Sequence, residues 1–416
     1  MEILSTGEKI KRARVYNGYT LKDICGDKVS VSKMSCIEND KVKAEEWILE
    51  LIAKKLNLDV DYLSQGIREQ LEKNVEQLNN RNLDNFEEKV IYNLGYAESS
   101  NYTDICFQLM HILFNYYLDH NMNEKIQSIN SQYYDYFQKC QKEDNELIYY
   151  MDMARFLFRT REYAQASNYY NNIRKSAKEK GDFIILAKAT YNEAACHIMV
   201  ENYDRAYEIA VRLEDLVQYL EGDFRKAEAY HMLAMLSISM DKGKFEMYEQ
   251  KSYELYKSDI RPKATAIYNY ATAMFDVGMK DKAIEYIKRA LELYPDDDKE
   301  DLVEFMLLAT NELYENGVLE EAQSICDNAL NFAIELDDVK FIETGYYYKS
   351  IILQKQNNLF SAEMYMNLSL DALFKFGTKI QIYKRYIEMG NMYHKLGQTR
   401  DAVKYFNLAV TLEKKM

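Results

Sequence analysis

Residues 264–295, with the sequence ATAIYNYATAMFDVGMKDKAIEYIKRALELYP, indicate the fold of most of the chain. Small residues stand at Ala271, Ala283 and Ala290, and small residues recur where two helices cross closely. The larger apolar residues between them can fill the gap to a neighbouring pair of helices. Pro262 stands shortly before this unit and Pro295 ends it, and proline is tolerated at both kinds of position. The stretch therefore predicts one helical hairpin.

The same unit recurs with a period near 40 residues. Its alanines head the second helix of successive pairs and are separated by 40, 77, 39, 40 and 40 residues: Ala166, Ala206, Ala283, Ala322, Ala362 and Ala402. The interval of 77 leaves room for one degenerate pair over 227–258. This pattern, repeated in YIEMGNMYHKLGQTRDAVKYFNLA (386–409), resembles the tetratricopeptide repeat. The resemblance implies a right-handed superhelix of tetratricopeptide-like helical hairpins that starts near residues 103–140.

The composition excludes several other classes of protein. The chain has two prolines and 14 glycines, whereas average usage predicts about 21 and 29, so it has too few turn residues for an all-β fold. No apolar run approaches the ~18 residues of a membrane span, and the first residues do not form a secretion signal. Six cysteines are scattered without a CxxC pair, which is typical of reduced thiols. We expect an all-α, cytoplasmic protein.

The charge is distributed unevenly. Residues 1–66 carry 11 basic and 11 acidic side chains, so the whole net charge of −14 belongs to residues 67–416. A strongly acidic surface repels polyanions. If the protein binds DNA, we therefore expect the first 66 residues to do so.

Short helices with clear caps are predicted in these 66 residues. The first helix begins at Ser5 or Thr6. Thr20 caps a helix over 21–25 and Ser30 caps a helix over 31–39. Two more helices are predicted over 44–56 and 60–63, with Gly66 as a stop signal. The segments GEKIKRAR, GYTLKDI, VSKMSCIEND and LIAKKLNLDVDYL together resemble an Xre/Cro-type helix-turn-helix domain over about residues 5–65. This resemblance implies a five-helix DNA-binding domain over 1–66, in which Arg14 and Glu38 form a structural ion pair.

The resemblance also makes residues 30–39 the recognition helix, which enters the major groove by its N-terminal end. The implied DNA contacts are Thr20, Lys22, Ser30, Val31, Ser32, Lys33, Cys36, Asn39 and Lys41. Many relatives have Gln at the position of Leu21, and Arg or Gln at the position of Cys36. The predicted recognition helix therefore has no side chain that makes two hydrogen bonds to one base. Sequence specificity can rest on DNA shape, on a contact of Val31 with a thymine methyl group, or on the spacing of the two DNA-binding domains of a dimer. Alternatively, the domain keeps this fold without binding DNA.

The remaining chain divides into two parts. Residues 67–100 are expected to form a linker helix, a turn at 79–82 and the entry to the array, and residues 101–416 are expected to form the repeat domain. The first helix of each tetratricopeptide pair faces the concave side, where asparagine can both donate to and accept from a peptide backbone. Aromatic neighbours can supply side-chain pockets, and basic residues can pair with a carboxylate. The peptide-binding candidates are Arg155, Arg159, Asn192, His197, Tyr268, Asn269, Phe275, Asn311, Tyr347 and Asn391.

A helix-turn-helix head followed by such repeats resembles the RRNPP family of cytosolic peptide-pheromone receptors. The resemblance implies a quorum-sensing transcriptional regulator that binds palindromic double-stranded operator DNA as a homodimer and is controlled by a short signalling peptide. The alternative is a tetratricopeptide interaction protein that binds and regulates a protein partner without binding DNA. No phosphate-binding loop, dinucleotide fingerprint, HExxH or GxSxG motif is present in the sequence. We therefore expect neither an enzyme nor a metal or cofactor site.

Overall fold

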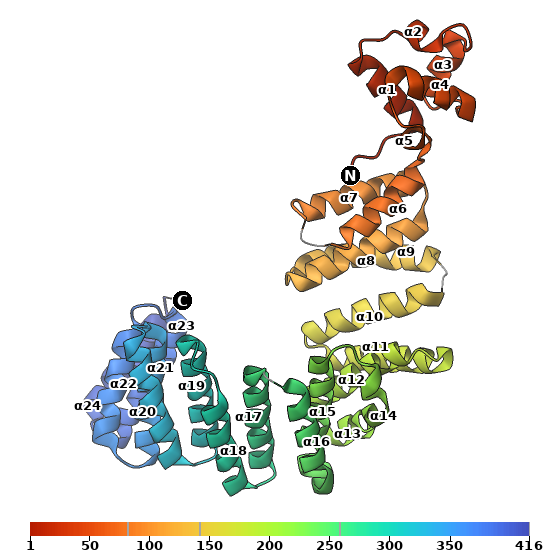
Figure 1. Ribbon diagram of the computed structural model, residues 1–416. Coiled ribbons are helices and arrows are strands. Elements are labelled where there is room, and N and C mark those ends of the chain that lie inside the picture. Colours follow the sequence, from red (N-terminus) through yellow and green to blue (C-terminus); the bar gives the residue numbers. More distant parts are fainter. Residues whose placement is uncertain (81–82, 141–142, 258, 416) are drawn as a thin grey trace. The chain divides into compact units, whose positions relative to one another are not determined.

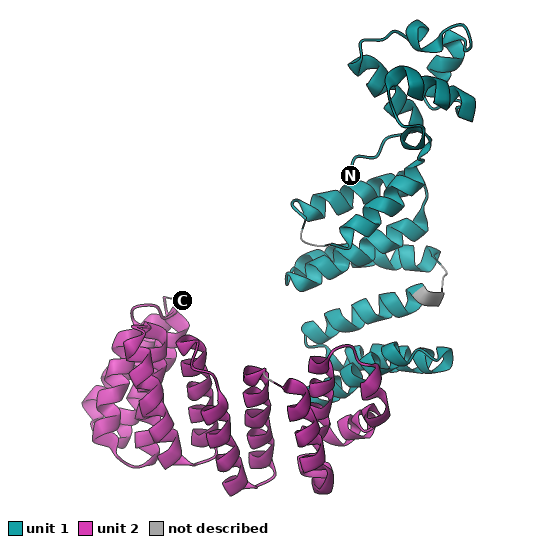
Figure 2. Ribbon diagram, viewed as in Figure 1, with its two compact units in different colours: residues 1–200 teal, residues 201–416 magenta. Residues whose placement is uncertain are grey.

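The computed structural model describes residues 1–80, 83–140, 143–257 and 259–415, and every regular element in those ranges is a helix (Figure 1). Contacts between backbone positions divide the chain into two compact units, residues 1–200 and 201–416 (Figure 2). The all-α fold predicted from the sequence is confirmed. No helix in the described ranges is both long and apolar enough to cross a bilayer.

Five short helices form the N-terminal head: α1 (Thr6–Tyr16), α2 (Leu21–Cys25), α3 (Val31–Glu38), α4 (Glu46–Leu56) and α5 (Val60–Ser64). The hydroxyls of Ser5, Thr20 and Ser30 each accept a bond from a backbone N–H in the first turn of the helix that follows. Asn39 is the residue after α3 rather than its last turn, and α4 begins two residues later than predicted. Buried apolar side chains from all five helices, among them Ile24 and Ile52, form one core.

Two helices follow the head: α6 (Ile67–Leu78) and α7 (Phe86–Ser99). Residues 81 and 82 of the turn expected here lie outside the described residues. The sequence description of α6 as a polar linker overlooks its apolar stripe, because Leu71, Val75 and Leu78 are buried in a cluster that also includes residues of α7 and α8. Gly66, expected to stop a helix, instead directly precedes α6. Helix α6 is therefore packed into the first helical bundle of the array.

The first four residues form a strap between the head and this bundle. Ile3 is fully buried in the cluster that contains α6 and α7. The Leu4 backbone is held on both sides by Gln70, whose Oε1 accepts from the Leu4 N–H at 3.1 Å and whose Nε2 donates to the Leu4 carbonyl at 2.9 Å. Asn74 Nδ2 donates to the Met1 carbonyl at 3.4 Å. The head is thus attached to α6 both through the chain at 65–66 and through the strap.

The rest of unit 1 consists of long antiparallel helices: α8 (Thr103–Asp119), α9 (Asn123–Lys139), α10 (Glu143–Arg159), α11 (Tyr163–Lys180) and α12 (Phe183–Met199). Unit 2 begins with α13 (Tyr203–Ala210), α14 (Leu213–Leu216) and a short 3-10 turn, η1 (Val217–Tyr219). Five hairpins follow: α15 (Asp223–Met240) with α16 (Lys242–Tyr256), α17 (Ile260–Asp276) with α18 (Lys280–Leu293), α19 (Lys299–Glu315) with α20 (Leu319–Glu335), α21 (Val339–Lys355) with α22 (Leu359–Leu373), and α23 (Lys379–Lys395) with α24 (Thr399–Glu413).

The repeating alanines explain the spacing of these hairpins. Each of the six alanines is the fourth residue of its helix, and each is buried. In α9 and α16 the fourth residues are Ile126 and Phe245, which are also buried. The degenerate pair predicted over 227–258 is α15 with α16, and Phe245 is the reason that the alanine spacing skips it.

Candidate functional site

An ion pair fixes the geometry of the head. Arg14 Nε donates to Glu38 Oε1 at 2.6 Å and its Nη2 donates to Oε2 at 2.9 Å, so the two planar groups meet edge to edge. The carboxylate is buried, and the hydrogen bonds that Arg14 donates to it raise the pKa of Arg14. Arg14 Nη1 also donates to the Tyr19 carbonyl at 2.9 Å. The pair joins α1 to the end of α3 and to the residue before the cap of α2.

The N-terminal turn of α3 presents a polar surface. Ser30, Val31 and Ser32 are exposed, whereas Met34 and Ile37 on the opposite side of α3 are buried in the head core. Of the remaining predicted DNA contacts, Thr20, Lys22, Asn39 and Lys41 are exposed, and Lys33 and Cys36 are half-buried. All nine candidates therefore lie on α2, on α3 or at their ends. Some are already engaged: the Thr20 hydroxyl donates to Asp23 at 2.6 Å, and Asn39 Nδ2 donates to the Ser35 carbonyl at 2.7 Å.

The charge of Lys33 is compensated by a neighbour that sequence reasoning missed. Its Nζ lies 2.8 Å from Oε1 of Glu45, whose other oxygen accepts from the Trp47 indole N–H at 2.6 Å. The Lys33 ammonium also lies 5.9 Å from the centre of the Trp47 ring. The bonds from Lys33 and then Trp47 lower the pKa of Glu45. A DNA phosphate would have to compete with Glu45 for Lys33. Trp47, the one tryptophan of the sequence, is 44% exposed beside this ion pair.

In unit 1 the predicted peptide contacts Arg155 and Arg159 are held by α8. Arg155 Nη1 donates to Asn115 Oδ1 at 2.5 Å, and Arg159 donates to the Leu118 carbonyl. Asn115 in turn donates to Asp152 Oδ1 at 3.0 Å, and Asn115 and Asp152 are both buried. The other carboxylate oxygen of Asp152, Oδ2, accepts a hydrogen bond from the Tyr133 hydroxyl at 2.8 Å. The same oxygen lies 2.6 Å from His111 Nδ1. This buried network, which the sequence pattern does not reveal, holds the exposed guanidinium group of Arg155, whereas that of Arg159 is held by the Leu118 carbonyl.

Two further candidates of unit 1 lie on α12. Asn192 and His197 are both half-buried there. Arg155 and Arg159 thus come from α10, and Asn192 and His197 come from α12.

In unit 2, Asn269 lies against a buried histidine. Asn269 Nδ2 is 3.3 Å from His231 Nε2, and burial lowers the pKa of His231 to about 4, so the ring is neutral at pH 7. The Nδ1 atom of His231 has no hydrogen-bond partner in the described residues. Tyr268 and Asn269 are half-buried, but Phe275 is buried in the core, so this candidate is not exposed to a ligand in this structure.

The other three candidates of unit 2 lie on α19, α21 and α23. Asn311 is half-buried and Asn391 is exposed. The Tyr347 hydroxyl donates to Glu388 at 3.1 Å, and the Arg385 guanidinium lies 4.1 Å from the centre of the Tyr347 ring. Tyr347 is therefore already part of a contact between α21 and α23.

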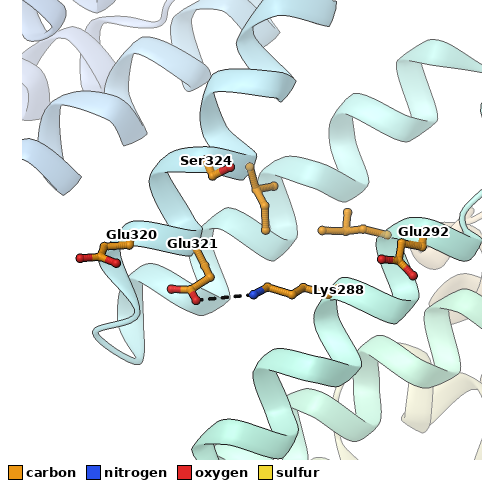
Figure 3. Close-up of a pocket in the computed structure, with 7 residues that line it drawn as sticks. Lys288, Glu292, Glu320, Glu321 and Ser324 are labelled. Carbon is orange, nitrogen blue, oxygen red and sulfur yellow. Dashed lines mark ion pairs between the residues drawn. The ribbon is translucent and has the colours of Figure 1, made fainter.

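A groove of about 420 Å³ opens elsewhere in unit 2, between the second helices α18 and α20 (Figure 3). Its lining consists of Lys288, Leu291, Glu292, Glu320, Glu321, Ser324 and Ile325. Lys288 Nζ lies 3.6 Å from Glu321 Oε1 across the groove. None of the predicted peptide contacts lines this groove. In the described residues no group of three or more His, Cys, Asp or Glu is placed to hold a metal ion.

Comparisons with known proteins agree with the repeat fold. Models of the tetratricopeptide repeat match residues 264–297 and 383–416. A comparison with curated protein sequences gives no match. The apo form of RapI is 13% identical, with a TM-score of 0.50, and the match covers 83% of this chain and 98% of that chain.

Two further solved structures are more distant. The apo quorum sensor NprR from B. thuringiensis is 14% identical over 83% of this chain and 99% of its own, with a TM-score of 0.43. Bacillus thuringiensis PlcR, in complex with the peptide PapR7 and DNA, is 14% identical over 93% of this chain and 98% of its own, with a TM-score of 0.31. RapI, NprR and PlcR are RRNPP-type receptors. At these identities the likeness to RapI establishes the repeat fold.

Proposed function

We propose that this protein is a quorum-sensing transcriptional regulator, which binds operator DNA through its head and is controlled by a short signalling peptide bound to its repeats. In this proposal residues 1–66 are the DNA-binding domain, residues 67–100 join it to the array as part of the first helical bundle, and residues 101–416 bind the peptide. The protein acts as a cytoplasmic homodimer on a palindromic site and performs no catalysis.

The observation that carries the DNA-binding part is the exposed N-terminal turn of α3. Val31 is 45% exposed although it is apolar, and it stands beside Ser30 and Ser32, which are also exposed. Side chains at this end of a recognition helix reach base edges, and a methyl group of valine can contact the methyl group of thymine. Lys22 precedes these residues in the chain and Lys41 follows them. Both can contact DNA phosphates and so fix the register of the head on the duplex. The bidentate Arg14–Glu38 pair holds the end of α3 in place.

The peptide-binding part rests on the polar groups of the first helices. In unit 1 two arginines, Arg155 and Arg159, are exposed and are held in position by α8, an arrangement that can pair with a peptide carboxylate. In unit 2, Asn269, Asn311 and Asn391 supply amides that are half-buried or exposed. A peptide controls the protein only if its affinity differs between two arrangements of the heads.

The intrinsic fluorescence of Trp47 gives a direct test of DNA binding, because the sequence has one tryptophan and it lies beside Lys33. We expect the emission to change when the full chain binds DNA from the region upstream of its own gene. The affinity should fall steeply with salt, and Lys22→Ala or Lys41→Ala should each reduce the salt slope by about one. Lys73→Ala, an exposed lysine on α6, is the matched control and should leave the slope unchanged. Absence of salt-dependent binding at low ionic strength would refute the DNA-binding proposal.

The peptide part has its own measurement. The first probes are the C-terminal segments of small exported products that are encoded beside the gene. A ligand should raise the melting temperature of the protein, and Arg155→Ala should remove that increase while leaving DNA binding by the head unchanged. An equal increase with the Arg155→Ala variant would exclude this arginine from the peptide site.

A further inference from the structure

The outer surface of α22 has an apolar ridge that its neighbours lack. Phe360, Met364 and Leu368 follow one another at intervals of four, so they lie on one face of the helix. Their exposed fractions are 83%, 51% and 39%. Single exposed apolar side chains are common, but a row of three along one helix face marks an interaction surface.

The repeat register shows that the α22 ridge differs from the matching positions on other helices in the polarity of its side chains and not in their exposure. Counted from the buried alanine of each second helix, the same three outward positions are Glu320, Ser324 and Asn328 on α20, and Arg400, Lys404 and Leu408 on α24. On α18 they are Asp281, Glu285 and Arg289. All these positions are exposed, and from the fourth residue to the twelfth the burial pattern of α20 matches that of α22 residue by residue. Polar side chains therefore occupy all three positions on α18 and α20 and the first two on α24, where the third is the apolar Leu408. Among these four helices, α22 alone presents three apolar side chains at these positions.

The charges beside the ridge suggest what covers it. Glu320 and Glu321 lie on the α20 side, and Arg400 and Lys404 lie on the α24 side. Glu320, Phe360 and Arg400 occupy the same register position on their helices, so they lie at one height along parallel helices. If a second copy is related by a two-fold axis that runs along α22, each α22 meets its counterpart and each α20 faces the α24 of the other copy. This arrangement brings Glu320 of one copy opposite Arg400 of the other.

We propose that this face is the dimer interface, in which the Phe360–Met364–Leu368 ridges of two copies pack in parallel and α20 of each copy pairs with α24 of the other. Helix α22 has 15 residues, so it is ~22 Å long, and three helices of ~10 Å width present roughly 660 Å². A standard interface buries about 800 Å² on each side, so the face is nearly large enough for a specific dimer. The inference rests on the homodimer of the proposed function and names the surface that forms it.

Sedimentation equilibrium of the full chain, without DNA or peptide, tests the interface. We expect a monomer–dimer equilibrium whose dissociation constant increases at least tenfold in Met364→Asp. Met247→Asp is the matched control, since Met247 holds the same register position on α16 and is 42% exposed. It should leave the equilibrium unchanged. Both substituted side chains are on the surface, and unchanged circular dichroism and melting temperature confirm that each variant is folded.

A charge exchange tests the two-fold arrangement. Glu320→Arg and Arg400→Glu should each weaken the dimer about two- to fivefold, and the double variant should restore the original dissociation constant. A monomer at every concentration, or a dimer that Met364→Asp leaves intact, would overturn the proposal, and so would additive losses in the double variant. Because no DNA is present, these results are independent of whether the head binds an operator.

Discussion

The ion pair between Arg14 and Glu38 makes a quantitative prediction about the stability of the head. The Glu38 side chain is 4% exposed and that of Arg14 is 15% exposed, so neither charge is well hydrated. Arg14→Ala leaves the carboxylate buried without its partner, and removal of one member of a buried pair costs about 3–5 kcal/mol. In a domain of this size each kcal/mol lowers the melting temperature by about 4–8 °C. We therefore expect Arg14→Ala to lower the melting temperature of the head by at least ~12 °C.

Trp47 separates this event from unfolding of the array, because the one tryptophan of the sequence lies in α4 of the head. Thermal unfolding of the full chain should be followed by tryptophan fluorescence for the head and by circular dichroism for all helices. Arg14→Ala should shift the fluorescence transition and leave most of the dichroism transition in place. A double variant, Arg14→Met with Glu38→Met, removes both charges and should recover most of the lost stability.

Two results would refute this reasoning. If the fluorescence transition of Arg14→Ala coincides with that of the original protein, the pair contributes nothing to the fold of the head. If the double variant is as unstable as the single one, the loss comes from the packing of the arginine side chain and not from a buried unpaired charge.

Three further predictions concern other parts of the chain. Glu45→Gln removes the competitor for Lys33 on α3, and gel-shift titrations should show DNA affinity raised about two- to fivefold; an unchanged affinity would mean that Glu45 does not compete with DNA for Lys33. Gly390→Ala should lower the melting temperature, since its Cβ would overlap the Phe406 ring and overpacking costs about 1–3 kcal/mol; Gly95→Ala, on an open helix surface, should instead stabilise by about 0.5–1 kcal/mol. Burial lowers the pKa of His231 from 6.5 to about 4. Between these pH values the unfolded chain therefore binds more protons than the folded chain. The free energy of unfolding falls by about 3 kcal/mol in all as the pH falls through this window. Melting at pH 7 and pH 5 should show a smaller loss for His231→Gln, and an equal loss would assign the effect to other groups.

The fold was largely predictable because close helix crossings demand small residues. Ala283 and Ala402 mark their hairpins for this reason, and the caps Thr20 and Ser30 mark the starts of α2 and α3. The alanine pattern failed at Phe245, where a large side chain is buried at the alanine position, and only the interval of 77 residues between Ala206 and Ala283 indicated the pair over 227–258.

The candidate site was less predictable, because polar networks have no period. Asn115 and Asp152 are buried and hold Arg155 in position, but in the sequence they are isolated polar residues among apolar ones. The compensation of Lys33 by Glu45 joins residues on either side of a turn, and propensity alone gives no distance between them. The polar composition of α6 also concealed its apolar stripe.

The strap of residues 1–4 limits the ways in which the head can move. A domain joined to its neighbour by one flexible connection can rotate about three axes, whereas a domain held at two separate points can swing only about the line that joins them. The head is held at residues 65–66 and again where Gln70 clamps both sides of the Leu4 backbone. Motion of the head relative to α6 is therefore a hinge with one degree of freedom, as long as Ile3 stays in its buried position. Any larger reorientation must first release the strap, at the cost of exposing that side chain to water.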